Sequence, residues 1–483
     1  MATFNRRVIL KSSVAAAAIA LSPFKTRASQ RIVMNDASRL SPTPVRAHWI
    51  VKPDQELQFV EKLRAELKVA RVEGRPIAVG AARHSMGGQS LPRDGTAISF
   101  DINRVEPNRS AKTFQVHAGT RWHQVIRALD PIGFSPAVMQ SNSDFGVAST
   151  FSVNAHGWPV PYGPFGATVR SIEMMLADGT VLSCSRTENA ELFKLAMGGY
   201  GFFGIILKLE VDMVENLLLQ PTFEVMPSAA LSKRFIEAAK DPAVRMLYGR
   251  LNVSKRDFFT QSLLVSYRAV TPQPAKLPVF GDAPAMLSRR LYRAQLNSEV
   301  GKKARWFAET VAAPKALSGI ATRNTLMAEP VRNLASDDRS RTDILHEYFV
   351  PPDRFGEFMK ACQEVIVPSG QEMLNITLRY VAADQESVMA FAPTARIAGV
   401  MSFSQDVSPE GEIGMLRMTE KLIDRVATLG GSFYLPYRLH ARRDQVAGIY
   451  KNTEQFVARK QHYDPDLVFR NAMWTAYFGT ARH

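Results

Sequence analysis

Three segments rich in glycine and alanine in the N-terminal half constrain the fold more than any other feature of the chain. They run from Gly80 to Gln89, from Gly146 to Gly166 and from Met197 to Ile206. Successive backbone N–H groups in a turn such as the first segment form a concave site suited to phosphate oxygens. The third segment crowds glycines at the start of an apolar strand, which is costly unless a flat ligand or another backbone lies against them.

The first segment matches neither of two common nucleotide-binding motifs. It lacks the Gly-Lys-Ser/Thr ending of a P-loop, and it has no G-x-G-x-x-G fingerprint. Taken alone, it fits a phosphate-binding turn or a tight glycine turn that binds nothing.

Hydrophobic periodicity predicts an α+β fold. Helical spacing of apolar residues occurs over 55–71, 122–129, 190–197 and 416–429. Runs typical of strands occur over 75–79, 96–100, 113–117, 170–176, 180–183, 203–211, 345–350 and 376–381. The Asp178-Gly179 pair marks a hairpin between two of them. Strands and helices do not alternate as they do in a doubly wound sheet.

The positive charge of the chain is local. The 483 residues carry a net charge of +15, of which residues 1–28 contribute +5 and residues 230–345 contribute +10. Within the second region, residues 285–311 read as an amphipathic helix or helix pair with an apolar stripe and arginines and lysines around it. We expect a solvated face there, or a peripheral contact with an anionic membrane or an acidic electron acceptor. Nucleic acid is not expected, because no binding motif is present.

The N-terminus has the order of an export signal. Arg6-Arg7 and Lys11 precede a short apolar run over 14–21 and small residues up to Ala28. Eight apolar residues cannot span a hydrocarbon core of about 30 Å. The paired arginines resemble a twin-arginine signal, so residues 1–28 are expected to be removed and the protein to be periplasmic or secreted. A chance basic start is the alternative.

Cysteine and histidine usage argues against metal binding. Cys184 and Cys362 are far apart, in segments assigned to different domains, so buried free thiols are expected rather than a disulfide. No Cys/His cluster has zinc spacing.

Together and in this order, the three glycine-rich segments resemble the FAD-binding domain of the vanillyl-alcohol oxidase and p-cresol methylhydroxylase superfamily. The nearest members are alditol and aldonolactone oxidases and cytokinin dehydrogenases. The segment from Tyr463 to Asn471 is similar to the C-terminal flavin-domain segment of that family. The resemblance implies a two-subdomain FAD-binding domain over 40–215, an α+β substrate cap over 216–435, and a return to the FAD domain over 436–483.

The same resemblance implies a set of cofactor-binding residues. The pyrophosphate would lie on Gly80, Ala81, Ala82, Arg83, His84 and Ser85. The flavin would be lined by Ser149, Asn154, His156 and Gly157, with Gly204, Ile205 and Asn471 also beside the cofactor. His84 occupies the position at which relatives bond a histidine to the flavin 8α-methyl group, so covalent FAD is expected; a non-covalent contact with the pyrophosphate is the alternative.

Candidate catalytic residues lie in and just after the cap. Arg379 matches a Glu-x-Arg pair of alditol-oxidase-like members, whereas Thr377 replaces the glutamate and puts a polyol substrate in doubt. Glu347 faces the pocket or belongs to a plain cap strand. Tyr437 or Arg438 stands where relatives place an active-site lysine, and His440 is a candidate base or a structural residue.

The sequence therefore predicts an exported FAD-dependent oxidoreductase. It would oxidise an alcohol, sugar or lactone-type CH–OH group of a small molecule and pass electrons to oxygen or to a quinone or cytochrome. The alternatives are a non-covalent flavoprotein of the decaprenylphosphoryl-ribose oxidase type, and a flavin electron-transfer subunit without turnover of its own.

Overall fold

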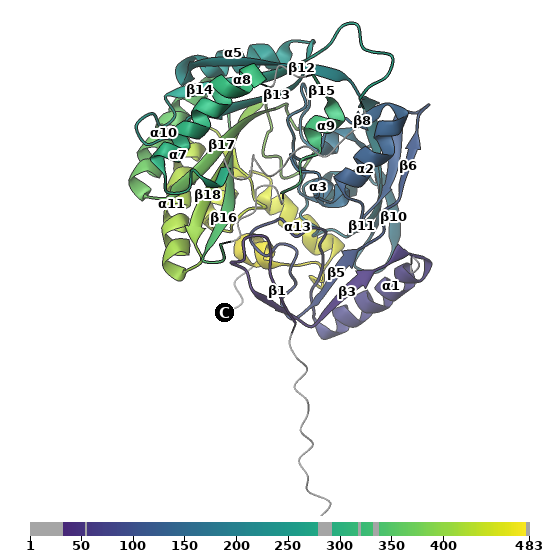
Figure 1. The fold of residues 1–483 in the computed structure, drawn as a ribbon. Coiled ribbons are helices and arrows are strands. Elements are labelled where there is room, and N and C mark those ends of the chain that lie inside the picture. The colour runs from purple at the N-terminus through teal and green to yellow at the C-terminus, as the bar shows by residue number, and fades with distance from the viewer. Residues whose placement is uncertain (1–31, 54–55, 279–291, 317–319, 332–337, 480–483) are drawn as a thin grey trace, which may run out of the picture.

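The computed structural model describes residues 32–53, 56–278, 292–316, 320–331 and 338–479 (Figure 1). Its mixture of helices with antiparallel and parallel strands confirms the α+β class. The expected signal segment, residues 1–28, lies outside the described residues.

A three-stranded parallel sheet begins the fold. Strands β3 (Ala47–Val51), β5 (Thr96–Phe100) and β4 (Ile77–Val79) pair in that order, and β1 (Ile32–Met34) and β2 (Thr43–Val45) form a separate antiparallel pair. Helix α1 (Glu56–Glu73) buries Leu63, Leu67 and Ala70, which recur at helical spacing on one face. In β4, the Ile77 amide donates to the carbonyl of Val468, so the C-terminal segment extends the hydrogen bonding of this sheet.

A six-stranded antiparallel sheet follows, with β11 (Ile205–Glu215) as its longest strand. β11 pairs with β7 (Thr113–His117), β8 (Phe134–Pro136) and β9 (Val169–Met175), while β6 (Val105–Asn108) and β10 (Val181–Ser185) are the edges. Between its strands lie α2 (Trp122–Leu129), α3 (Val147–Ser152) and α4 (Ala190–Ala196). Val211 and Leu209 of β11 are buried, as alternation on a half-buried strand requires.

The middle of the chain forms an eight-stranded sheet in the order β15-β12-β14-β13-β17-β18-β16-β19. The strands are β12 (Leu218–Pro227), β13 (Val244–Leu251), β14 (Gln261–Ala269), β15 (Ala321–Thr322), β16 (Arg341–Val350), β17 (Glu372–Val381), β18 (Arg396–Asp406) and β19 (Ser432–Phe433). Helices α5 (Ser228–Lys240), α10 (Phe355–Ser369) and α11 (Pro409–Thr428) cover its outer face (Figure 1). The opposite face is therefore left for the site described below.

After this sheet the chain returns to the first half. Helices α12 (Arg443–Ile449) and α13 (Thr453–Tyr463) lead into a segment that contacts the loop after β4, where the Asn471 side chain donates to the Gln89 carbonyl over 2.7 Å. A fully buried ion pair between Lys460 and Asp464 fixes this segment: the Lys460 ammonium also donates to the Phe202 carbonyl over 2.7 Å. Asp464 accepts hydrogen bonds from the Val468 and Phe469 amides at 2.9 and 2.7 Å.

Most local expectations are confirmed. Helix α2 has the expected bounds, the hairpin β9–β10 forms around Asp178-Gly179, and both cysteines are buried free thiols. Within the described part of the chain, no helix is long and apolar enough to cross a bilayer.

The segment expected to be an amphipathic helix or helix pair over 285–311 differs from that expectation in the environment of its side chains. Of it, residues 292–311 are described, and they include α7 (Glu299–Phe307); a π-helical turn (Ala308–Ala312) and α8 (Ala313–Ala316) follow α7 directly. Val300 and Phe307 of the apolar stripe are 80% and 60% exposed, whereas Lys302 is buried on Glu372 and Arg305 pairs with Glu309. The carboxylates of neighbouring elements turn these basic side chains inward, so the face is not a simple solvated basic one.

Candidate functional site

A cavity of about 1360 Å³ lies between the loop after β4, helix α3 and the inner face of the eight-stranded sheet. This volume exceeds the roughly 300–1000 Å³ of pockets for drug-sized ligands. Most of the expected site residues line it: Gly80, Ala81, Ala82, Arg83, His84, Ser85, Ser149, His156, Gly204, Ile205, Glu347, Arg379, Tyr437 and Asn471. Residues from all three glycine-rich segments therefore meet in one place.

The loop Gly80–Gln89 is held at both ends and left open in the middle. At one end the Gly80 amide donates to the Ile98 carbonyl over 2.9 Å, and at the other the Met86 amide donates to the Pro436 carbonyl over 3.1 Å. Between them, the backbone N–H groups of Ala81, Ala82, Arg83, His84 and Ser85 donate to no acceptor among the described residues. Buried backbone donors are nearly always paired, whereas these five lie on a partly exposed loop beside a cavity, where successive N–H groups can bind water or an anionic ligand.

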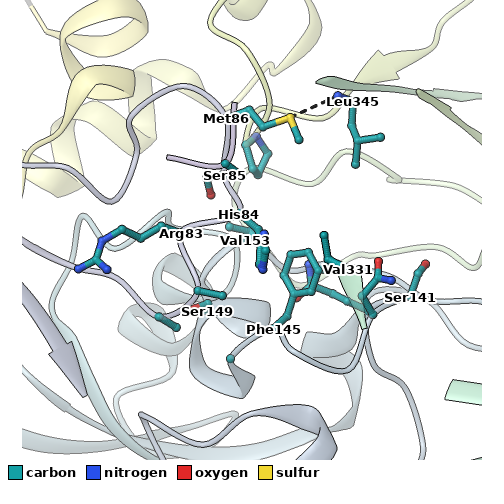
Figure 2. A pocket seen from close by; sticks show the side chains of 18 of the residues that line it. Arg83, His84, Ser85, Met86, Ser141, Phe145, Ser149, Val153, Val331 and Leu345 are labelled. Atoms are coloured by element: carbon teal, nitrogen blue, oxygen red, sulfur yellow. Dashed lines mark hydrogen bonds between the residues drawn. The ribbon is translucent and has the colours of Figure 1, made fainter. Parts of the chain in front are cut away.

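His84 lies beside the aromatic ring of Phe145 (Figure 2) and beside the Asp144 carboxylate. Its Nε2 is 3.7 Å from Asp144 Oδ2, and its ring packs against Phe145 with centroids 4.5 Å apart. Burial raises the pKa of Asp144, but hydrogen bonds from His84 and the Val331 amide outweigh burial and lower it. The side chain of Arg83 extends away from this group and donates to Ser99 Oγ over 2.6 Å (Figure 2). His84 is therefore oriented by Asp144, which contacts only one of its two ring nitrogens.

The second glycine-rich segment contributes only part of what was expected of it. Ser149 on α3 and His156 line the cavity, whereas Asn154 and Gly157 are not among its lining residues. The Asn154 amide is instead committed to Asp384 Oδ2 at 2.9 Å and to the Gly166 N–H at 2.8 Å. A Cβ at Gly157 would lie 2.2 Å from the Met139 carbonyl oxygen, so this glycine is required by a neighbouring backbone.

The glycines of the third segment serve two purposes: one allows close packing of a neighbouring strand, and another lies at the cavity. A Cβ at Gly204 would meet the Met174 side chain at 2.5 Å and the Met175 carbonyl at 2.6 Å, so close strand packing requires glycine there. Gly201 has φ +76° with nothing within 4 Å of its missing Cβ, and it faces the cavity.

Glu347 is the centre of a buried hydrogen-bonded group on β16. Its Oε1 contacts His156 Nε2 closely, and its Oε2 accepts from the Tyr437 hydroxyl at 3.3 Å. His156 Nδ1 lies 3.3 Å from the Gly157 carbonyl oxygen. Burial, with the Glu347 carboxylate second, raises the pKa of Tyr437 well above its ordinary value, so this phenol stays protonated and donates.

Arg379 lies on the same wall, on β17. It is 9% exposed, donates to Ser141 Oγ over 2.9 Å and stacks over Trp158 at 5.5 Å. Burial, followed by repulsion from Arg250, lowers its pKa to about 10, so it remains a cation at neutral pH. Thr377 also lines the cavity and contacts the Arg250 guanidinium.

Arg438 and His440 lie outside the cavity. Both contact Glu412, and the Arg438 guanidinium also donates to the Met86 carbonyl over 2.7 Å. The structure therefore places Arg438, expected as a catalytic candidate, behind the loop Gly80–Gln89, where it holds the loop instead of facing the cavity.

Several cavity residues were not expected from the sequence. They are Gln140, Ser141, Trp158, Tyr248, Arg250, Tyr267, Tyr292, Arg305 and Glu309. Trp158 lies inside the second segment, directly after Gly157, and could have been expected at the site with its neighbours. Arg250 lies on β13, where inward and outward residues alternate, but the strand itself was not predicted.

The lining residues fit a large nucleotide cofactor of the FAD type. The unpaired N–H groups suit a pyrophosphate, and the small side chains of Gly80, Ala81, Gly146 and Ala148 leave backbone exposed for close approach. Among the described residues, no group of three histidine, cysteine or acidic side chains is placed to hold a metal ion.

Comparisons with known proteins agree with this fit. Residues 55–185 match the model of the FAD binding domain family. D-arabinono-1,4-lactone oxidase of Yarrowia lipolytica is 28% identical over 187 residues, which are 36% of this chain and 34% of that protein. L-gulonolactone oxidase of Mus musculus is 29% identical over 34% of this chain and 38% of its own length. Cytokinin dehydrogenase 1 of Arabidopsis thaliana is 30% identical over 34% of this chain and 29% of its own length. The match thus spans about a third of each of these relatives.

Proposed function

The chain carries the FAD-binding domain of the superfamily that includes vanillyl-alcohol oxidase and p-cresol methylhydroxylase, and we propose that it oxidises a CH–OH group of an alcohol, sugar or lactone. The observation that carries the proposal is the run of five unpaired backbone N–H groups over Ala81–Ser85, which open into the same cavity as Glu347. One ligand can thus be held by the loop Gly80–Gln89 while a second lies against the eight-stranded sheet. When bound, FAD supplies the two-electron acceptor that the reaction requires.

In this proposal, Glu347 takes the proton of the substrate hydroxyl at Oε2. The carboxylate is held by His156 and Tyr437, so it needs little reorganisation to face a substrate in the cavity. Arg379 binds a substrate oxygen, and the stacked Trp158 helps to keep its guanidinium in place. Burial of these side chains excludes water from the reacting groups.

We propose that His84 carries the cofactor covalently. Its support is the position of His84 within the open loop and the orientation of its ring by Asp144 and Phe145. A covalent link would prevent loss of FAD after export, which the Arg6-Arg7 segment favours. Electrons would pass to oxygen or to a quinone or cytochrome.

The experiment is to mix the purified flavoprotein anaerobically with a panel of alcohols, sugars and lactones and to monitor the visible absorbance of the flavin. Bleaching by a CH–OH donor, slowed in Glu347→Gln but not in the exposed-site variant Glu410→Gln, supports the proposal. A protein that binds FAD and is bleached by none of them supports a flavin electron-transfer subunit instead. Bleaching with flavin that acid releases completely supports a non-covalent enzyme of the decaprenylphosphoryl-ribose oxidase type.

A further inference from the structure

Two arginines on neighbouring strands of the eight-stranded sheet face the cavity together. Arg250 on β13 is paired in register with Thr377 on β17. Side chains two residues apart on a strand share a face, so Thr377 and Arg379 point to the same side. All three line the cavity, and the Arg250 guanidinium contacts Thr377 Oγ1.

Neither guanidinium has a carboxylate partner within ion-pair distance among the described residues. Arg379 donates to Ser141 Oγ, and its buried Nε has no hydrogen-bond partner. Arg305, which lines the same cavity, is by contrast paired with Glu309 at 2.9 Å. Leaving a buried donor unpaired is costly, and so is placing two cations together; burial and the nearby Arg250 both lower the pKa of Arg379.

The acidic side chains of the cavity form no ion pair with either arginine among the described residues, although Glu309 attracts Arg250 and Glu347 attracts Arg379 electrostatically. Glu309 is committed to Arg305, and Glu347 is committed to His156 and Tyr437. Burial raises the pKa of Glu329 despite the opposing effect of Arg250, which favours its neutral form. Asp343 forms an ion pair with Arg293.

Aromatic rings hold both guanidinium planes. Arg379 lies over Trp158 at 5.5 Å and Arg250 over Tyr248 at 5.3 Å, and the two rings meet edge to face at 5.6 Å. A stacked guanidinium keeps the N–H donors at its edge free for planar oxyanions.

From this arrangement we infer that the substrate carries an oxyanion, a carboxylate or a phosphate, which binds between Arg250 and Arg379. The inference rests on the proposed function for the reaction itself and adds the chemical class of its substrate: a hydroxy acid or a phosphorylated alcohol. The donors Arg379, Arg250 and Thr377 bind the anionic end, while Glu347 on β16 faces the hydroxyl-bearing carbon.

The test is isothermal calorimetry of the protein, as purified with its flavin, against malonate, inorganic phosphate and the neutral malonamide. Malonate or phosphate is expected to bind at least tenfold more tightly than malonamide, and which of the two binds distinguishes a carboxylate from a phosphate substrate. Arg250→Gln should weaken binding about ten- to a hundredfold, since a charge-assisted hydrogen bond is lost. Arg250→Lys should retain more affinity than Arg250→Gln, and Arg256→Gln, an exposed arginine of the loop after β13, should bind as the wild type does.

Equal binding of malonate, phosphate and malonamide overturns the inference, as does unchanged anion affinity in a folded Arg250→Gln protein. Melting temperature and flavin content of each variant establish folding. A protein without flavin that still binds malonate through Arg250 would refute the proposed function and leave the anion site standing. A flavoprotein whose cofactor is reduced by neutral alcohols and that binds no anion would support the proposed function and refute the anion site.

Discussion

Removing the charge of Glu412 tests how much its interactions with Arg438 and His440, behind the loop Gly80–Gln89, stabilise the fold. The Glu412 carboxylate accepts hydrogen bonds from the Arg438 guanidinium, from His440 Nε2 at 2.8 Å and from Gln405 Nε2 at 2.9 Å. Burial raises its pKa, but His440 and Arg438 outweigh burial and lower it from 4.5 to about 2. Each pKa unit corresponds to about 1.4 kcal/mol, so the charged form contributes roughly 3 kcal/mol to folding at neutral pH.

Glu412→Gln should therefore lower the free energy of unfolding by about 3 kcal/mol at pH 7. For a chain of this length the entropy of unfolding is roughly 1 kcal/mol per degree, so the melting temperature should fall by about 3 °C. Because the folded-state pKa is depressed, this contribution is fully present above pH 4.5 and is lost as pH falls toward 2. The difference in melting temperature between wild type and Glu412→Gln should therefore become smaller as the pH falls from 4.5 toward 2.

Scanning calorimetry at several pH values measures both effects. Glu410→Gln is the matched control, because Glu410 lies in the same first turn of α11 and is exposed. A gap that does not change with pH, or an equal loss in the control, would refute the reasoning.

The other predictions concern residues that line or support the cavity and the C-terminal segment after α13. Glu347→Gln should slow anaerobic flavin reduction about 10²- to 10⁴-fold without loss of FAD, as measured by stopped-flow absorbance, if Glu347 is the proton acceptor. His84→Ala should release all flavin into the supernatant on acid precipitation, whereas wild-type protein should stay yellow and heavier by one FAD in its mass spectrum. Arg438→Gln should lower the FAD content of the purified protein, measured by visible absorbance against protein concentration, because the Met86 carbonyl loses its donor. Asp464→Asn should lower the free energy of unfolding in denaturant titrations by about 3–5 kcal/mol, because buried Lys460 loses its counter-charge.

Local sequence signals predicted the elements that local physics controls. The helix Trp122–Leu129 has one apolar face and a proline after it, and the β9–β10 hairpin has an Asp-Gly turn. The three glycine-rich segments were expected to share a site because their order resembles a known domain. Periodicity alone could not place them in one cavity.

Hydrogen-bond and ion-pair partners determine which of the expected residues face the cavity and which do not. Asn154 and His156 are two positions apart, yet one is committed to Asp384 and the other reaches Glu347, far away in sequence. Arg438 follows Tyr437 directly and points to Glu412 rather than to the cavity. Such choices depend on long-range contacts, which a single sequence does not specify.

The apolar and basic pattern of 292–311 misled for the same reason. Lys302 and Arg305 are attracted inward by Glu372 and Glu309, which come from other parts of the chain or the next turn. Arg250 was missed because the strand Val244–Leu251 was not predicted, although Asp241-Pro242 and Asn252 flank it.

The most direct test of the account is the FAD content of the purified protein, measured by visible absorbance against protein concentration and by equilibrium dialysis with added FAD. The account predicts one FAD per chain, held by the loop Gly80–Gln89. A folded protein that is colourless and takes up no FAD would contradict it.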